Sequence, residues 1–417
     1  MKKISAYKTY LLYSCATAML FWMVFSVNMI YQVEVLHLSP LQLVLIGTTL
    51  EAACFIFEIP TGIVADIYSR KLSVIIGLVM MGIGFILEGS VPSFYAIIAA
   101  QVLWGTGYTF ISGAIDAWVA GEVTDMKLDN IYMKGSQIGQ AGSIAGIVIG
   151  TLVGGILINL PIILSGGLHL FLALSLLRFM PEEHFVCSAL EDKNTFGNMV
   201  HTLKISIRYI RVSPIIILLL AVTFFIGMSS EGYDRLSTAH FLKDTVMPQA
   251  FGFKAVTWFG IFNVVGMLLT MVGMQFIVKK LEKKNKAGSF PVLVMSISAH
   301  IVGLIVFAAT RNFTWMLCAY LTIHVVRRIN EPILNAWLNN HLEDQARATV
   351  LSTNGQVDAL GQILGGPLIG IIASKLSIST GILCTVLFLL PVTGIYFLTQ
   401  VRERQYNKDL DSGRDYN

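Results

Sequence analysis

The sequence predicts an all-α membrane protein with twelve transmembrane helices in two bundles of six. Of the 417 residues, 55% are apolar and only 13% are charged, about half the charged fraction of a soluble domain, and the mean hydropathy is +0.71. Residues 9–33, 89–115 and 135–177 carry no charge, and about 20 apolar residues suffice to span a bilayer. This composition excludes a DNA-binding protein, a secreted disulfide scaffold and an ordinary cytosolic enzyme.

The apolar stretches are expected to be helices, because lipid cannot hydrogen-bond an open backbone and no stretch alternates like a barrel strand. They lie near residues 9–33, 41–65, 72–90, 94–118, 132–156, 160–180, 213–233, 255–278, 288–310, 313–337, 349–374 and 378–400. The first is too long for a signal peptide and has no clear small-residue cleavage site, so we expect it to be retained. The predicted domains are an N-terminal bundle (1–180), a polar linker (181–212), a C-terminal bundle (213–400) and a tail (401–417).

The placement of basic residues predicts the orientation. With the N-terminus inside, all but five of the 29 lysines and arginines fall on the inner side, if Arg327 and Arg328 are counted there. The five exceptions are Arg235, Lys243, Lys254, Arg311 and Lys375. Because inner loops carry the excess of positive charge, both termini and the linker are expected to be cytoplasmic. The expected location is the cell membrane, as a multi-pass protein of a bacterial cytoplasmic membrane.

No cofactor or metal is predicted. The five cysteines are scattered without metal-ligand spacing and are expected to be buried thiols; they are Cys15, Cys54, Cys187, Cys318 and Cys384. The phosphate-binding pattern GxxxxGK[ST] is absent from the sequence, so ATP is not the direct energy source within this chain. A proton gradient is the energy source that we expect.

A weak repeat relates the two halves at a shift of 219 residues. Ala117-Trp118 precedes Asp125, Gly142 and Gly146, and Ala336-Trp337 precedes Asp344, Gly361 and Gly365, with a one-residue slip in register. Two related bundles with a substrate site near mid-membrane are a common transporter plan. Small residues let helix backbones approach closely, so we expect a packing role for Gly146, Gly150, Gly154, Gly155, Gly361 and Gly365.

The end of the second span carries a family resemblance. Gly62, Asp66, Arg70 and Lys71 follow the spacing of the major facilitator signature between helices 2 and 3, although Ile67 and Ser69 replace its usual basic residue and second glycine. The resemblance implies the major facilitator fold, with Asp66, Arg70 and Lys71 in a cytoplasmic latch. Glu58 before the glycine, and Glu51 seven residues upstream, resemble the clostridial-type tetracycline efflux proteins.

Other segments resemble the drug:proton antiporter branch of the same superfamily. Residues 146–155 are similar to the antiporter motif of exporters, with Thr151 where proline is usual. Gln101 stands where many proton-coupled exporters have arginine. Residues 112–118 and 231–236 are similar to elements of the tetracycline-resistance-like branch.

Glu51 and Glu58 are the predicted proton-coupling residues. A charge at mid-bilayer costs at least about 2.5–3.5 kcal/mol, so such residues face a cavity or a partner. Seven residues is nearly two turns, which puts both carboxyls on one helix face about 10 Å apart. Burial favours the neutral form of a carboxyl group, as a proton carrier near pH 7 requires. The alternative is that one or both are permanently paired structural residues.

The tenth span places two arginines well inside the bilayer. Arginine cannot shed its charge, so Arg327 and Arg328 need an acidic partner or an anionic substrate. Glu331 is four and three residues away, which allows pairing along the helix, and Pro332 is consistent with a kink. An internal ion pair that shapes the kink and a substrate-facing role both stay open.

The remaining ionisable groups are assigned to gates or the cavity. Asp116 is expected at a gate or helix end rather than at the substrate, and Asp358 with Gln356 is expected to line the cavity. Glu231, Asp234 and Arg235 are expected to form a local ion pair at an outer gate. His169 and His300 are expected to be satisfied core residues, and packing is the preferred role for the aromatic side chains Trp22, Trp104, Tyr108 and Phe110.

Together, the resemblance implies a proton-coupled secondary transporter that exports an amphipathic drug-like molecule, such as a tetracycline-type antibiotic, by alternating access. Its partners would be a small-molecule substrate, protons and the lipid bilayer, without nucleic acid, and the chain would act as a monomer. Proton-coupled nutrient uptake stays open, opposed only by the glycine pattern of the fifth span, as does lipid flipping by the same fold. We do not expect an enzyme, since catalytic carboxylate pairs, a histidine-rich metal cluster and a nucleophile motif are absent from the sequence.

Overall fold

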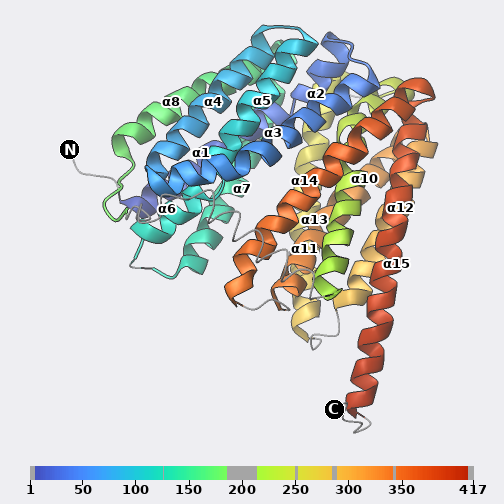
Figure 1. The fold of residues 1–417 in the computed structure, drawn as a ribbon. Helices are drawn as coiled ribbons and strands as arrows, with labels where there is room; N and C mark the ends of the chain where they lie inside the picture. The colour runs from blue at the N-terminus through green and yellow to red at the C-terminus, as the bar shows by residue number, and fades with distance from the viewer. Residues whose placement is uncertain are drawn as a thin grey trace. The chain divides into compact units, whose positions relative to one another are not determined.

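A computed structural model describes residues 5–124, 126–185, 214–248, 252–283, 289–340 and 344–411. Within these ranges every regular element is a helix (Figure 1). The chain divides into two compact units. Unit 1 comprises Met1–Thr195 and Gln249–Val264, and unit 2 comprises Phe196–Pro248 and Val265–Asn417. Most of the predicted linker, 186–212, and the end of the predicted tail, 412–417, lie outside the described residues.

Unit 1 contains the first eight helices and a π-helical segment. They are α1 (Ala6–Phe25), α2 (Asn28–Ile30), η1 (Tyr31–Val35, the π-helix), α3 (Pro40–Ile67), α4 (Arg70–Ser90), α5 (Phe94–Ile111), α6 (Ala114–Glu122), α7 (Leu128–Ile156) and α8 (Leu160–Phe179). Serine side chains cap the N-termini of two of these helices. Ser39 and Gln42 form a capping box at the start of α3, in which each side chain accepts from the backbone N–H of the other residue, and Ser69 caps α4. Such caps satisfy backbone N–H groups that a helix start leaves without partners.

Two predicted spans are interrupted in the structure. The first breaks after α1 into the short α2 and η1, and the fourth breaks between α5 and α6. At the second break Gly113 has φ 73°, a conformation that glycine adopts without steric cost. The sequence predictions treated both stretches as continuous helices because hydropathy does not register a local change of backbone path.

Unit 2 contains five whole helices and most of a sixth, α11, whose residues 255–264 belong to unit 1. They are α10 (Pro214–Asp244), α11 (Ala255–Lys283), α12 (Ser289–Ala309), α13 (Phe313–Asn340), α14 (Asp344–Lys375) and α15 (Ile378–Asp411). Eleven helical stretches among the described residues are long and apolar enough to cross a membrane, against twelve predicted spans. The predicted span outside those eleven is α13, which carries Arg327, Arg328 and Glu331.

The helix pairings inside the two units correspond. In unit 1, α1 packs against α7 and α8, and α4 packs against α5 and α8 (Figure 1). In unit 2, α10 packs against α14 and α15, and α12 packs against α13 and α15. The first, third, fourth, fifth and sixth spans of each half therefore make equivalent partnerships, as expected for a chain with two related halves.

Candidate functional sites

The carboxyl groups of α3 lie in an acidic cluster of unit 1. Glu51 and Glu58 are seven residues apart on α3, and the Cys54 thiol between them points to the carbonyl oxygen of Gly105 on α5, at 3.7 Å. The hydroxyl of Ser112, which follows α5, hydrogen-bonds Glu58. This face of α3 is therefore directed toward α5.

Tyr108 of α5 connects these carboxyl groups with a third one. It interacts electrostatically with Glu51, Glu58 and Asp116 of α6. The hydroxyl of Tyr132 on α7 donates to the backbone oxygen of Asp116 at 3.3 Å. Asp116, which the sequence predictions assigned to a gate, thus shares a neighbour with both predicted proton carriers.

A second polar site of unit 1 lies in its core and is absent from the sequence predictions. Glu88 of α4 is 1% exposed. It accepts hydrogen bonds from the side-chain amides of Gln32 in η1 at 3.0 Å and Gln101 of α5 at 3.3 Å. The indole N–H of Trp104 donates to the Gln101 oxygen at 2.8 Å. The signal in the sequence is a single carboxylate in the stretch 72–115, which contains no other charged residue.

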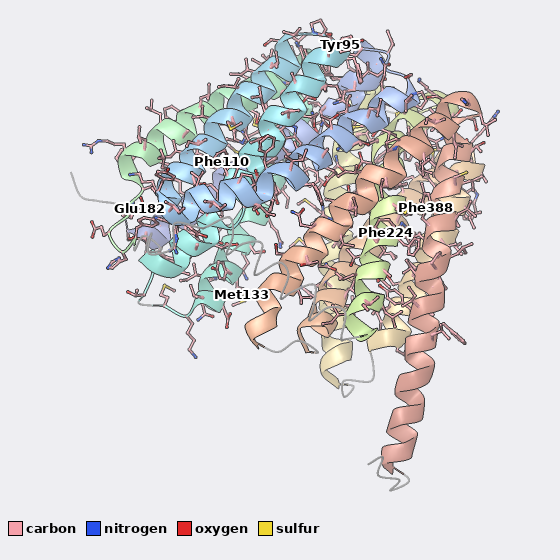
Figure 2. The ribbon with its side chains drawn as sticks, viewed as in Figure 1. Tyr95, Phe110, Met133, Glu182, Phe224 and Phe388 are labelled. Carbon is pink, nitrogen blue, oxygen red and sulfur yellow. The ribbon has the colours of Figure 1, made fainter. Side chains whose placement is uncertain are left out.

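The predicted latch residues meet the segment that follows α8. The carboxylate of Glu182 accepts from the Ser69 hydroxyl at 2.6 Å and from the backbone N–H of Lys71 at 2.9 Å; Figure 2 labels Glu182 near α6. Arg70 donates to the backbone oxygen of Ala117 on α6 at 2.8 Å. Asp66 is exposed. Glu182 is a partner that the motif did not reveal.

The end of α6 holds the same segment. The indole N–H of Trp118 donates to the Pro181 oxygen at 2.7 Å, and Glu122 accepts from the backbone N–H groups of Glu183 and His184 at 2.8 and 2.7 Å. We call residues 181–184 the clasp, because they join the start of α4 to the end of α6.

The predicted packing glycines of α7 and α14 lie in close helix contacts, with one exception. A Cβ atom added at Gly146 would meet the backbone oxygen of Met19 on α1, and one at Gly365 would meet that of Met228 on α10. The same test places Gly150 against Met23, Gly154 against Val27 and Gly361 against Phe224. At Gly155 nothing lies within 4 Å. The α1–α7 and α10–α14 contacts are therefore built alike.

In unit 2, an ion pair joins α10 to α13. Arg327 donates two hydrogen bonds to the carboxylate of Asp234, one from Nη2 at 2.8 Å and one from Nη1. Its guanidinium lies 5.8 Å from the centre of the Tyr233 ring. The side chains of Arg327 and Asp234 stay 28% and 44% exposed. The side chain of Glu331, the predicted partner of Arg327, lies outside the described residues; Arg328 is exposed.

The predicted outer-gate residues of α10 divide between two pairs. Glu231 is buried and accepts from Nε of Arg235, one turn along the helix, at 2.9 Å. Asp234, by contrast, is held by α13. Spacing along one helix indicates the pairing of Glu231 with Arg235, but it cannot indicate that Asp234 binds Arg327 of another helix. The gate role of the three residues stays a prediction.

Polar groups of α14 lie near this ion pair. Asp358 interacts electrostatically with Arg327 and accepts from the Gln362 amide at 2.8 Å. Gln356 is half-buried; it lies two residues from Asp358 and so off that helix face. Thr223 of α10 donates to Asn354 of α14 at 2.7 Å.

The two predicted core histidines are buried, and they differ in surroundings. His169 of α8 contacts the backbone oxygen of Ser165 at 2.8 Å. His300 of α12 interacts electrostatically with Arg327 and Asp234. Among the described residues, no group of three or more His, Cys, Asp or Glu side chains could hold a metal ion.

A family profile and a known protein both match most of this chain. The family profile described as Major Facilitator Superfamily matches residues 11–366. The chain is 26% identical over 359 residues to "Uncharacterized MFS-type transporter YxaM" of Bacillus subtilis (strain 168), covering 84% of this chain and 85% of that protein.

Two solved structures illustrate the similarity of fold. The crystal structure of nucleoside transporter NupG has a TM-score of 0.75 at 16% identity, over 95% of this chain and 99% of its own. A bacterial homolog of the human lysosomal transporter Spinster has a TM-score of 0.72 at 14% identity, over 96% and 98%. At these identities the likeness concerns the fold alone.

Proposed function

Because this chain belongs to the Major Facilitator Superfamily and is a secondary transporter of that fold, we propose that it exports an amphipathic, drug-like molecule in exchange for protons. Export would use the proton gradient, since no ATP-binding motif is present in the sequence. We place the chain, with both termini cytoplasmic, in a bacterial cytoplasmic membrane and working as a monomer. A 1–180 bundle and a 213–400 bundle would alternate access to a small-molecule substrate.

The acidic cluster of unit 1 is the observation that carries the proposal. Glu51, Glu58 and Asp116 all interact with Tyr108, so three carboxyl groups of unit 1 share one tyrosine as a neighbour. Intramembrane carboxyl groups of this kind are typical of proton relays. We assign proton coupling to Glu51 and Glu58, and we assign substrate contacts to the group around Arg327 and Asp358.

Arg328, Glu331 and Gln356 complete the proposed substrate-side residues. In the proposed cycle, Asp66, Arg70 and Lys71 close one end, where the backbone N–H of Lys71 donates to Glu182 of the clasp, and Glu231 with Arg235 closes the other. Uptake of a polar or anionic nutrient is the second candidate. The part-exposed pair of Arg327 and Asp234 favours it, because such a pair offers a charged contact to a polar cargo.

Drug accumulation in cells tests the proposal. The chain is expressed in a drug-sensitive bacterium without its own pumps, and tetracycline accumulation is measured with and without a protonophore. Lower accumulation that rises on uncoupling is expected. Glu51→Gln and Glu58→Gln should each abolish it, whereas Asp129→Asn, which changes an exposed acid at the start of α7, should not.

Three other outcomes would contradict the proposal. Full activity of both glutamine variants would remove proton coupling through α3. Higher accumulation in energised cells would indicate uptake. No effect on any member of a broad drug panel would favour lipid or metabolite transport.

A further inference from the structure

His240, at the end of α10, has an acceptor at each ring nitrogen. Its side chain is 1% exposed. Nδ1 lies 2.8 Å from Oδ2 of Asp244, the last residue of α10, and Nε2 lies 3.0 Å from the backbone oxygen of Phe307 on α12. The Asp244 side chain is 32% exposed, so it connects a buried imidazole with solvent.

The oxygens of Asp244 and Phe307 determine how many hydrogens the His240 ring and its two partners must share. A neutral imidazole has one N–H and one lone pair, and a carboxylate and a carbonyl oxygen bring no hydrogen. A neutral His240 beside an ionised Asp244 has one hydrogen for two acceptors, so the lone pair of one ring nitrogen, Nδ1 or Nε2, would face an oxygen lone pair. The contact needs one more proton, as imidazolium with carboxylate or as neutral imidazole with carboxylic acid. Both forms hold the same proton, so it belongs to the pair.

The oxygen of Phe307 that faces the ring lies at the C-terminal end of α12. The helix α12 ends at Ala309, so Phe307 is among its last four residues, whose carbonyl groups lack a partner within the helix. This end of a helix carries partial negative charge, and a protonated histidine is stabilised there. The proton therefore helps hold α10 against α12.

An aromatic contact links this site to the ion pair of unit 2. The ring of Phe307 lies 5.1 Å from that of His240 and 5.5 Å from that of Tyr233, centre to centre. Tyr233 in turn faces the guanidinium of Arg327. Packed side chains therefore connect the α10–α12 contact with the residues around Arg327.

We propose that His240 and Asp244 form a proton-binding site. The proton leaves to water through the Asp244 carboxyl group, and what stays is a neutral imidazole whose hydrogen is donated from Nδ1 to the Asp244 carboxylate, the stronger of the two acceptors. The lone pair of Nε2 then faces the Phe307 oxygen. Repulsion between the lone pairs of Nε2 and the Phe307 oxygen then loosens the end of α10 from α12. Only the link from this site to the transport cycle rests on the proposed function.

Other ionisable groups lie on the elements around this end of α10. Tyr320 of α13 packs on the Phe241 ring at 5.6 Å. The backbone oxygen of Arg311 accepts from the Thr245 hydroxyl at 3.3 Å. Lys243 on α10, Arg311 after α12 and Lys375 at the end of α14 are exposed. The lysines serve as controls, since an effect of surface charge alone would follow them as well.

The variant Asp244→Asn removes the titrating carboxyl group but keeps a hydrogen bond to His240. Its amide donates an N–H to Nδ1 of a neutral imidazole, so the geometry is kept without a titrating proton. The measurement is ¹⁵N NMR of histidine-labelled full-length protein in detergent between about pH 5 and about pH 8, with the signal assigned by comparison with H240Q or, if that variant fails to fold, by its shift in D244N.

We expect the wild-type ring to have both nitrogens protonated at the acidic end and one at the alkaline end. In D244N the ring should stay neutral throughout, with its hydrogen on Nε2, and K243Q should match the wild type. A wild-type His240 that is neutral across the range, or a D244N protein that titrates like the wild type, would overturn the proposal.

Thermal unfolding provides the second readout. The contact stabilises the fold in the proton-loaded form, so its contribution is present at low pH and lost as pH rises. Relative to D244N, the wild-type Tm should fall by at least about 1 °C from the acidic to the alkaline end, and K375Q should follow the wild type. A difference that stays constant with pH would mean that Asp244 is only structural. Neither measurement uses a cargo, so both test the proton-binding site even if the protein does not export drugs.

Discussion

Arg327 of α13 and Asp234 of α10 are 93 residues apart in the chain and form an ion pair with two hydrogen bonds. Arginine keeps its charge at any physiological pH, so its carboxylate partner decides whether that charge is tolerated inside a membrane. The pair also stays part-exposed. It therefore joins two helices, and under the proposed function it is also a charged contact for a cargo.

Loss of the carboxylate should impair transport. A hydrogen bond to a charged group contributes about 1.5–3 kcal/mol, and about 1.4 kcal/mol is a factor of ten. We therefore expect Asp234→Asn to lower the initial rate of tetracycline efflux at least about tenfold, and Asp234→Arg combined with Arg327→Asp to recover part of it. Wild-type activity in Asp234→Asn would contradict a functional role for the pair.

The glycine contacts should distinguish positions on one helix. Gly146→Ala places a methyl group against the backbone of Met19, and such overpacking costs about 1–3 kcal/mol. We expect Tm to fall by about 1 °C for each kcal/mol in a chain of this length, and Gly365→Ala should act alike in α14. The matched control is Gly155→Ala, also in α7, where the methyl group meets nothing within 4 Å. Equal effects at positions 146 and 155 would refute the packing argument.

The buried carboxyl group of Glu88 in α4 should stabilise the fold through the hydrogen bonds that it accepts. Glu88→Leu leaves the amides of Gln32 and Gln101 without their acceptor, and each unsatisfied buried group costs about 1–3 kcal/mol. Glu88→Gln keeps a polar group of similar shape and should lose less stability. Thermal unfolding of both variants in detergent measures the difference. The argument fails if the leucine variant is as stable as the glutamine variant.

The clasp should protect the start of α4. Removal of a cap costs about 1 kcal/mol, which corresponds to about a fivefold change in local opening. We expect Glu182→Ala to speed amide hydrogen exchange at Lys71 by about that factor, because its N–H donates to the Glu182 carboxylate. Amides within α8 provide the internal control and should exchange at the wild-type rate. An unchanged rate at Lys71 would show that the clasp does not stabilise this helix start.

The helical architecture could be predicted because it depends on composition. A lipid environment requires each span to satisfy its own backbone hydrogen bonds, so long apolar runs indicate helices without reference to their neighbours. The breaks after Phe25 and at Gly113 escaped prediction. They are local changes in backbone path within stretches that are apolar throughout.

The relative positions of two site residues could be predicted where both residues lie on the same helix. Glu51 and Glu58 share a face of α3 by their spacing, and Glu231 pairs with Arg235 one turn away. The partner of Arg327, the amide partners of Glu88 and the clasp were not predictable. Each joins residues from different elements, and no periodicity along one element records which helices become neighbours.

For this protein, the order of the amino acids alone specified apolar spans, the kinship of the two halves and the family signature around Asp66, since these are properties of stretches of chain. Packing selected Asp234 as the partner of Arg327, enclosed Glu88 between two amides and gave His240 a second acceptor on α12. The physical reason is that a buried polar group takes whichever partner the fold brings within hydrogen-bonding distance, and that partner is set by the crossing of helices rather than by distance along the chain.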